Sequence, residues 1–290
     1  MAIRFIRLSV IASVALFAGL GQADAQEETC MFVQAHRGFS ENYPENTLRA
    51  FEEAINAGAD RIETDLALTR DREVVLMHDR SLDRTTDGRG RVQSYTLEQI
   101  KELDAGSWKG EEFAGERVPT LREALELTMG RAILNLELKT GQSTMIINED
   151  TFDGLVEVVT ELDAFDWVIV SSFDANALNS VVEREPRLRT LLLDWSPPSA
   201  NDGLALAISF GFNAWSPSSQ HIIEDSVQRA KDAGISVHVG AGANTDLARF
   251  SAWGVDGVSN DDPSLLVGML ERAGLRPADG SGCLEQARAR

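Results

Sequence analysis

Residues 132–139 read Ala132-Ile133-Leu134-Asn135-Leu136-Glu137-Leu138-Lys139, a run that changes from wholly apolar to alternating. Successive side chains of a β-strand point to opposite faces, so the leucines share one face and Asn135, Glu137 and Lys139 share the other. Strands of an open doubly wound sheet pack helices on both faces and are apolar throughout. A leucine face under helices and a polar face near an open mouth instead indicate a (β/α)8 barrel.

Strand-length apolar runs recur along the chain and alternate with amphipathic, helix-length segments. The eight predicted strands are 31–36, 61–68, 132–138, 167–171, 188–193, 212–215, 235–239 and 257–259. The clearest predicted helices are 47–57, 120–128, 150–162, 174–184, 222–233 and 246–253, several of them followed by glycine. Eight β/α units without a linker predict a single barrel domain over residues 26–290.

Residues 79–119 interrupt this alternation. They contain a glycine-rich turn at 87–90 and a short helix pattern opened by Thr96, with Gln99 three residues later as in a capping box. We expect a βα-loop insertion after the second strand, over the face on which the active site lies.

The first 25 residues have the pattern of a secretory signal peptide. Arg4 and Arg7 precede an apolar stretch at 8–20, and Ala23-Asp24-Ala25 supplies a cleavage signal before Gln26. The apolar stretch is shorter than the roughly 20 residues of a spanning helix, which favours cleavage over an uncleaved membrane anchor. We expect export to the periplasm or the extracellular space, with no stable membrane insertion.

Charge and cysteine content restrict the partners and the compartment. The formal net charge is −19, and it becomes −20 once residues 1–25, with two arginines and one aspartate, are removed. Such a chain repels nucleic acid, but a small anionic substrate remains compatible because a bound cation reverses the local sign. In an oxidising compartment Cys30 and Cys283 are expected to form a disulfide, the alternative being two free thiols.

Three carboxylates occur at the ends of two predicted strands. Glu63 and Asp65 share a face of one strand, and Glu137 lies near the end of another. Buried charges are costly unless they are paired or bind a metal, so these carboxylates predict a divalent-cation site.

Two of the four histidines follow strand-like runs. His36 precedes Arg37 and Gly38 at the end of the first predicted strand, and His78 follows an apolar run at 74–77. The strands of a barrel all end at one face, so both imidazoles are expected to converge on the carboxylates. A histidine at a strand end is more often a hydrogen-bonded core or rim residue, but the joint pattern indicates catalysis.

These motifs, in this order, resemble the glycerophosphodiester phosphodiesterase family over about residues 31–271. The motifs are His36-Arg37-Gly38, Glu45-Asn46-Thr47, Glu63-Thr64-Asp65, His78-Asp79, residues 135–139, residues 255–257 and Asp261-Asp262-Pro263. The resemblance implies a (β/α)8 barrel that hydrolyses phosphodiesters with one divalent cation, Ca²⁺ or Mg²⁺. It implies Glu63, Asp65 and Glu137 as metal ligands and His36 and His78 as the acid/base pair.

The other candidates are substrate-binding residues. Arg37 and Lys139 are expected to contact phosphate oxygens, the first bidentately and the second as a point charge, and Asn135 to line the site one step deeper. Our hypothesis has His36 as base and His78 as acid, and the reverse is equally compatible. Glu45 has two interpretations: a metal ligand, or part of a helix N-terminus capped by Asn46.

Some predictions concern the pocket walls and the remaining histidines. Phe173 and Trp215 are candidates for the wall of an alcohol pocket, although rim packing is the commoner role. His221 is expected at the surface or a helix start, and His238 in the core. The family usually has a tryptophan-threonine-x-asparagine element after the seventh strand, where this chain has residues 240–243, Gly-Ala-Gly-Ala. We therefore expect a wider or looser pocket.

The leading hypothesis is a metal-dependent enzyme that hydrolyses glycerophosphodiesters, the deacylated phospholipids, to an alcohol and glycerol 3-phosphate. One alternative is a phospholipase D-like enzyme acting on intact lipid. Another is a non-catalytic exported protein that binds phosphate esters. Retention of both histidines and all three carboxylates argues against the second alternative, because a receptor needs no acid/base pair.

Overall fold

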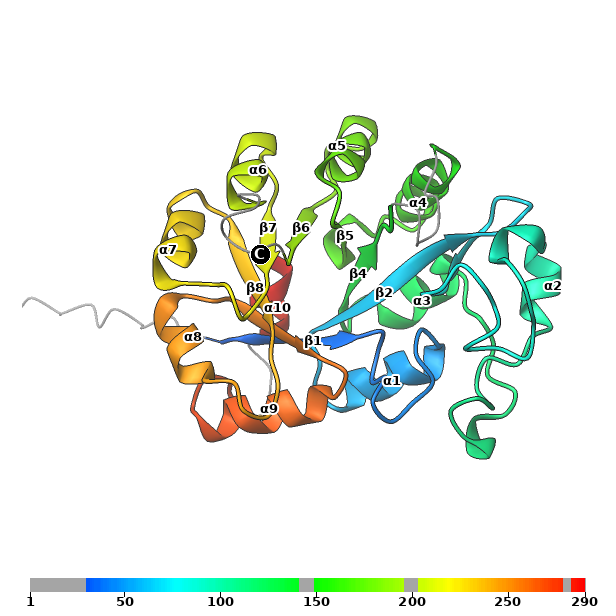
Figure 1. Cartoon of the computed structure of the whole chain (residues 1–290), viewed down its shortest axis with the longest axis horizontal. Coiled ribbons are helices and arrows are strands. Elements are labelled where there is room, and N and C mark those ends of the chain that lie inside the picture. The colour runs from blue at the N-terminus through cyan, green and yellow to red at the C-terminus, as the bar shows by residue number, and fades with distance from the viewer. Residues whose placement is uncertain (1–29, 141–148, 196–202, 279–282, 290) are drawn as a thin grey trace, which may run out of the picture.

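The computed structural model describes residues 30–140, 149–195, 203–278 and 283–289, so the predicted signal peptide lies outside the described residues. Strands within these ranges form one sheet (Figure 1). They are β1 Phe32–His36, β2 Arg61–Leu68, β3 Val74–Leu76, β4 Ile133–Glu137, β5 Val168–Ser172, β6 Thr190–Asp194, β7 Ala214–Pro217, β8 Ser236–Gly240 and β9 Gly257–Asn260.

All of these strands except β3 close into a parallel barrel. The hydrogen-bonded order is β1-β9-β8-β7-β6-β5-β4-β2-β3, and β1 also pairs with β2. The β1–β2 pairing sets His36 beside Glu63, and the β2–β4 pairing sets Asp65 beside Glu137. The predicted (β/α)8 fold is confirmed, and each of the eight predicted strands overlaps one barrel strand.

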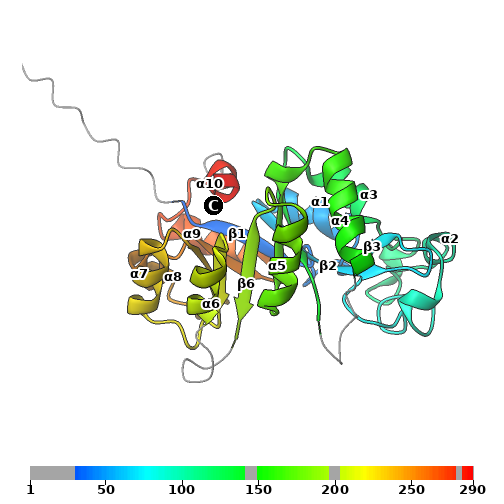
Figure 2. The same cartoon turned by 90° about the horizontal axis from the view of Figure 1, so that it is seen from above.

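Helices surround the barrel (Figures 1 and 2). They are α1 Leu48–Asn56, α2 Leu97–Lys101, α3 Leu121–Thr128, α4 Glu149–Glu161, α5 Ala175–Arg184, α6 Gly203–Phe210, α7 Glu224–Asp232, α8 Leu247–Trp253, α9 Pro263–Arg272 and α10 Cys283–Ala289, with 3-10 turns at Val92–Ser94, Glu111–Phe113 and Phe165–Trp167. Gly254 caps α8 with φ of 94°, a left-handed conformation that glycine adopts without a Cβ clash. The helices α6, α9 and α10 were not among the predicted segments.

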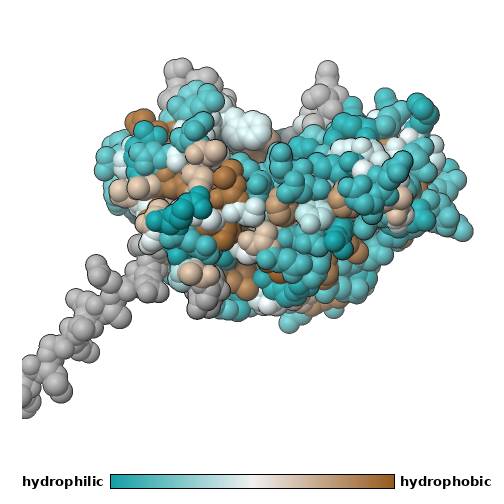
Figure 3. All heavy atoms as spheres, turned by 90° about the horizontal axis from the view of Figure 1, so that it is seen from below, coloured by the Kyte–Doolittle hydropathy of each residue, from teal (hydrophilic) through white to brown (hydrophobic). Residues whose placement is uncertain are grey.

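The alternation at residues 132–139 separates the two faces of β4 as expected. Leu134, Leu136 and Leu138 are fully buried in the main apolar cluster, which also contains side chains from the surrounding helices. Asn135 and Glu137 line the cavity at the barrel mouth. Hydrophilic side chains cover most of the outer face in Figure 3, in keeping with the acidic composition.

The strand β3 is absent from the sequence prediction. It pairs antiparallel with the far end of β2, which runs on past the barrel, so the interruption begins before residue 79. Residues 79–119 then lie to one side of the barrel, next to β2 and β3 (Figures 1 and 2). Thr96 and Gln99 form the predicted capping box at α2. A separate apolar cluster holds the segment against the hairpin, formed by Ala67, Val75, Met77, Leu82, Val92, Ile100, Ala105 and Val118.

The helix α10 closes the end of the barrel that lies away from the mouth (Figure 2). Cys283 begins this helix and forms a disulfide with Cys30, which confirms the predicted pairing. Cys283 and Ala287 pack against side chains of the lower barrel, among them Phe32. Near the end of α10, the Ala287 carbonyl accepts a hydrogen bond of 3.1 Å from Arg61 Nη2. The described residues contain no helix that is both long and apolar enough to cross a membrane.

Candidate active site

The mouth of the barrel holds three carboxylates from two neighbouring strands. Glu63 and Asp65 are on β2 and Glu137 is on β4, and one oxygen of each lies within 4.8 Å of the others. Two oxygens that share a cation at about 2.4 Å lie at most about 4.8 Å apart, so this spacing suits ligation of one ion. The structure thus brings together the three residues predicted as metal ligands.

Burial and mutual repulsion disfavour the ionised forms of two of these carboxylates. Burial first, and then the charge of Asp65, raise the pKa of Glu63 to about 8 and that of Glu137 to about 7. Within the described part of the chain, Glu63 Oε1 and Asn135 Oδ1 are buried without a hydrogen-bond partner. Buried polar atoms usually have partners, so these oxygens fit a site that is completed by a cation or a substrate.

Asp65 differs from the other two carboxylates because cations surround it. Lys139 Nζ lies 2.7 Å from its Oδ1, and Arg37 Nε lies 3.6 Å from its Oδ2. Burial raises the pKa of Asp65, but the charges of Lys139, His78 and Arg37 outweigh burial and lower it. The predicted substrate-binding cations Arg37 and Lys139 therefore lie beside the carboxylate cluster.

Asn46 orients Asp65 and does not cap α1, which corrects the sequence interpretation. Its Nδ2 donates to Asp65 Oδ2 at 2.8 Å, and its Oδ1 accepts from the Thr64 hydroxyl at 2.7 Å. The N-cap is Thr47, whose hydroxyl accepts a hydrogen bond from the backbone N–H of Ala50. Asn46 has φ of 57°, a left-handed conformation that asparagine tolerates better than most residues. Because Thr47 takes the capping role, the Asn46 amide is available to bind Thr64 and Asp65.

His36 lies between a metal-site carboxylate and an aspartate from the loop after β9. Its Nδ1 is 2.5 Å from Asp261 Oδ1, and its Nε2 is 3.8 Å from Glu63 Oε2. Burial lowers the pKa of His36, but the hydrogen bond to Asp261 and the charge of Glu63 raise it to about 9 overall.

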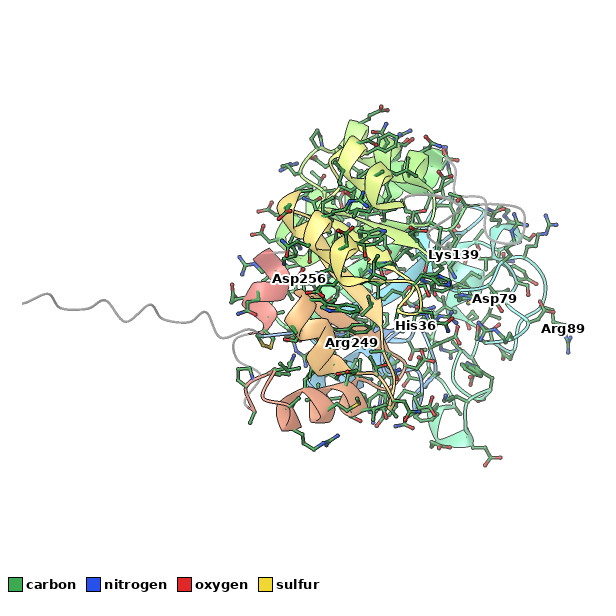
Figure 4. All side chains as sticks on the ribbon, turned by 60° about the vertical axis from the view of Figure 1, so that its left-hand side comes forward. His36, Asp79, Arg89, Lys139, Arg249 and Asp256 are labelled. Atoms are coloured by element: carbon green, nitrogen blue, oxygen red, sulfur yellow. A yellow bond between two sulfur atoms is a disulfide. The ribbon has the colours of Figure 1, made fainter. Side chains whose placement is uncertain are left out.

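His78 has a similar hydrogen-bond arrangement and lines the same cavity. Its Nδ1 lies 2.7 Å from Asp79 Oδ1. Burial lowers the pKa of His78 by more than the charge of Asp65 and the hydrogen bond to Asp79 raise it. Figure 4 shows His36, Asp79 and Lys139 at the same end of the barrel, whereas Asp256 lies toward the end that α10 closes. Each imidazole thus has Nδ1 on a carboxylate, which leaves Nε2 for a substrate.

Glu45 binds two arginines and lies outside the three-carboxylate group. It accepts from Arg37 Nη1 at 3.1 Å and from Arg84 Nη1 and Nη2 at 2.7 and 2.8 Å. Arg84 Nε also donates to Asp79 Oδ2 at 2.6 Å. Arg84 therefore links Asp79, which binds His78, to Glu45, which binds Arg37. Sequence reasoning missed Arg84 because it is 39 residues from Glu45 and carries no motif of its own.

Comparison with known proteins places this site in a family. The model of the glycerophosphoryl diester phosphodiesterase family matches residues 36–265. The chain belongs to this family. It is 38% identical over 251 residues to a glycerophosphodiester phosphodiesterase of Caldanaerobacter subterraneus subsp. tengcongensis, covering 83% of this chain and 98% of the relative. A glycerophosphodiester phosphodiesterase of Bacillus subtilis is 33% identical, with 80% of this chain and 83% of the relative covered.

Solved structures agree with the family assignment. A phosphodiesterase of Oleispira antarctica, determined with the product sn-glycerol-3-phosphate, superposes with a TM-score of 0.73 at 31% identity, covering 83% of this chain and 97% of that one. A glycerophosphodiester phosphodiesterase of Agrobacterium tumefaciens superposes with a TM-score of 0.70 at 27% identity, covering 81% and 98%. The predicted family and the predicted class of enzyme, a phosphoric diester hydrolase, are both confirmed.

In this member of the family, Glu63, Glu137 and both histidines border one cavity of about 840 Å³, and Asp65 lies buried beside it. Gly240 and Gly242 line it on the β8 side, and a Cβ placed on either glycine would meet no atom within 4 Å. The open space at this position agrees with the wider pocket expected from the missing aromatic element. Phe173 also lines the cavity, whereas Trp215 is 6% exposed and packs in the main apolar cluster, so of its two predicted roles the structure supports packing.

The two remaining histidines divide between the cavity and the core. His221 lines the cavity, which the expectation of a surface or helix-start position did not include. His238 is buried at the lower end, where its Nδ1 is 3.0 Å from Arg61 Nη1 and its Nε2 is 3.0 Å from the Ser236 hydroxyl. The core role predicted for His238 is therefore supported by its contacts.

Proposed function

We propose that this protein hydrolyses glycerophosphodiesters to an alcohol and glycerol 3-phosphate, with one divalent cation held by Glu63, Asp65 and Glu137. The observation that carries the proposal is that a cluster of three carboxylates, two of which line the cavity, lies beside two carboxylate-bound histidines that line the same cavity. The product sn-glycerol-3-phosphate in the Oleispira antarctica phosphodiesterase gives the substrate class.

The donor set supports a hard cation. All three proposed ligands are carboxylate oxygens, which Ca²⁺ and Mg²⁺ prefer, whereas zinc favours nitrogen and sulfur. The raised pKa values of Glu63 and Glu137 add to this, because a bound cation would offset both the burial and the repulsion from Asp65 that raise them. When bound, the cation would neutralise charge on the phosphate oxygens.

The residues of the chain supply positioning and proton transfer. Arg37 and Lys139, held beside Asp65, would contact the remaining phosphate oxygens and orient the diester for in-line attack. One histidine accepts a proton at Nε2 from the attacking water or from a neighbouring substrate hydroxyl, and the other donates one to the leaving alkoxide. Asp261 and Asp79 fix the orientation of the two rings.

The division of acid and base between the histidines is open to a direct test. In the ion-free protein the pKa of His36 is raised and that of His78 is lowered, so His36 holds its proton more tightly and suits the role of acid. This is the reverse of the hypothesis that has His36 as base. A cation on Glu63 would, however, lower the pKa of His36. A p-nitrophenolate leaving group needs little protonation, whereas the alkoxide of choline must be protonated as it leaves. Replacement of the acid with alanine should therefore impair glycerophosphocholine hydrolysis far more than bis(p-nitrophenyl) phosphate hydrolysis, and replacement of the base should impair both.

The overall proposal is tested by assaying both diesters with Mg²⁺ or Ca²⁺ and then with a chelator. We expect turnover that the chelator removes and the metal restores. Turnover that is insensitive to the chelator would contradict the metal site. Tight binding of a diester without turnover would instead favour the non-catalytic binding protein.

We also propose that the chain acts after export. The disulfide between Cys30 and Cys283 supports an oxidising compartment, and the pattern of residues 1–25 supports secretion. N-terminal sequencing of the protein from the source cells should give Gln26 as the first residue. A chain that retains residues 1–25 in the cytoplasm would contradict this.

A further inference from the structure

Two large aromatic side chains stand exposed at the rim of the active-site cavity. Phe173 follows β5 and is 46% exposed, and Trp195 follows β6 and is 67% exposed. Their ring centroids are 4.8 Å apart and their planes meet at 77°. Both border the cavity that Glu63, Glu137 and the two catalytic histidine candidates also line. Exposed aromatic surface next to a reaction centre indicates a binding surface more than a contribution to the core.

The position of the pair relative to the metal site follows from the order of strands. The strand β4, with Glu137, pairs with β5, and β5 pairs with β6, so the aromatic pair stands one and two strands from a proposed metal ligand. Ser171, opposite Glu137 in the sheet, is two residues before Phe173. A diester whose phosphate is bound at the carboxylates can thus extend one ester group toward the pair. Across the cavity, Gly240 and Gly242 provide no wall.

We propose that Phe173 and Trp195 form a subsite for a quaternary ammonium group, so that the preferred diesters carry a choline-like alcohol. The inference rests on the proposed function and adds the class of the leaving alcohol. The two rings pack edge to face and form a corner, in which a methylated ammonium can stack on the open face of one ring and contact the other, with cation–π attraction. The net charge of −19 further favours a cation over an anionic headgroup.

A fatty acyl chain is the competing occupant, and the lining disfavours it. A long chain needs a continuous apolar groove, but Ser216, Ser218 and Gln220 interrupt the apolar lining that residues such as Leu193 and Pro217 contribute. A compact cation with an apolar shell requires only the aromatic corner itself. The structure therefore favours glycerophosphocholine over lysophosphatidylcholine.

The test compares kcat/KM for glycerophosphocholine with kcat/KM for glycerophosphoglycerol and for the 3,3-dimethylbutyl ester of glycerol phosphate, which has the shape of choline without its charge. We expect the wild-type protein to prefer choline over the neutral isostere. In Trp195→Leu, which keeps apolar bulk, that preference should fall by about 3- to 30-fold, and Trp195→Phe should restore part of it. Trp108→Leu is the matched control, because Trp108 is 38% exposed and lies in the insertion.

Several outcomes would overturn the subsite. One is an equal fall in kcat/KM for the choline ester and for its neutral isostere in Trp195→Leu. Another is that Trp108→Leu loses the preference for choline as much as Trp195→Leu does, and a third is a preference for lysophosphatidylcholine that depends on Trp195. If the wild-type protein hydrolyses no diester, the proposed function fails, and the subsite is then tested by binding alone. In that case glycerophosphocholine should quench tryptophan fluorescence in the wild type and not in Trp195→Leu, and equal quenching would overturn the subsite.

Discussion

The two ends of the barrel both bury charged side chains, but they pair them differently. At the closed end, Asp60 accepts from both Arg276 and the backbone N–H of Val33, and Arg61 bonds to His238. At the open end, Glu63, Asp65 and Glu137 face one another, and the cations beside them lie mainly at Asp65.

This difference separates structural from functional charge. A buried charge with well-placed opposite partners can be retained for structure alone, and loss of one partner is what destabilises the fold. Like charges held together lower stability unless a ligand neutralises them, so their presence indicates binding or chemistry. Here Glu63 and Glu137, whose pKa values are raised to about 8 and about 7, are the residues of this kind.

The largest expected effect comes from removing a histidine at the open end. His36→Ala and His78→Ala should each lower kcat by about 10²- to 10⁴-fold, because a proton transfer loses its carrier. The melting temperature should change little, since both side chains are partly exposed. Steady-state assays and thermal unfolding measure the two effects. His221→Ala is the control from the same cavity, and an equal loss in that variant would contradict the assignment.

A pair of carboxylate substitutions compares the two ends directly. Asp60→Asn leaves Arg276 without its ion partner and should lower the unfolding free energy by about 3–5 kcal/mol. Glu137→Gln removes a like charge and should leave the unfolding free energy in chelator equal to or above that of the wild type. Urea unfolding gives both values. Comparable destabilisation by the two variants would refute the distinction between the two ends.

Metal binding also compares the two ends, but here the substitution at the open end is expected to have the larger effect. Mg²⁺ or Ca²⁺ at about 100 times its Kd should stabilise the wild type by about 2.7 kcal/mol, because only the folded chain assembles the three ligands. The gain should persist in Asp60→Asn and largely disappear in Glu137→Gln. Equal stabilisation of both variants would place the cation elsewhere.

Removal of the disulfide tests whether a loss of stability at the closed end affects catalysis at the open end. Replacing Cys30 and Cys283 together with serine should lower the unfolding free energy by about 2–4 kcal/mol. Since α10 lies at the far end from the cavity, kcat measured well below the melting temperature should stay unchanged. A substantial loss of kcat under those conditions would show that the two ends are coupled.

The smallest expected effect concerns Arg84, which joins the insertion to the open end. Arg84→Lys cannot hold Glu45 and Asp79 together and should lower kcat about 10-fold with little change in KM. The pH dependence of kcat should shift as well, because Asp79 is the partner of His78. Arg89→Lys at the outer edge of the insertion is the control (Figure 4). A loss confined to KM would exclude a role in orienting His78.

Sequence alone gave the barrel, its eight strands, the disulfide and the residues that converge at the mouth. Strand periodicity allowed this, because the face of Glu63, Asp65 and Glu137 follows from two-residue spacing once the strands are located. The hairpin with β3 was missed because three apolar residues give a weak periodic signal. Asn46 was misassigned because asparagine and threonine are both good N-caps, and the local sequence does not choose between them.

The sequence by itself therefore determined which chemical groups are present and the strand ends on which they lie. The strand ends could be located because strand periodicity is a local property of near neighbours in the chain. Only the tertiary structure decided which groups pair. Arg84 with Glu45, His36 with Asp261 and Trp195 with Phe173 are contacts between segments that closure of the barrel brings together. Their partners are fixed by strand order and packing, and these long-range constraints leave no periodic trace in the local sequence.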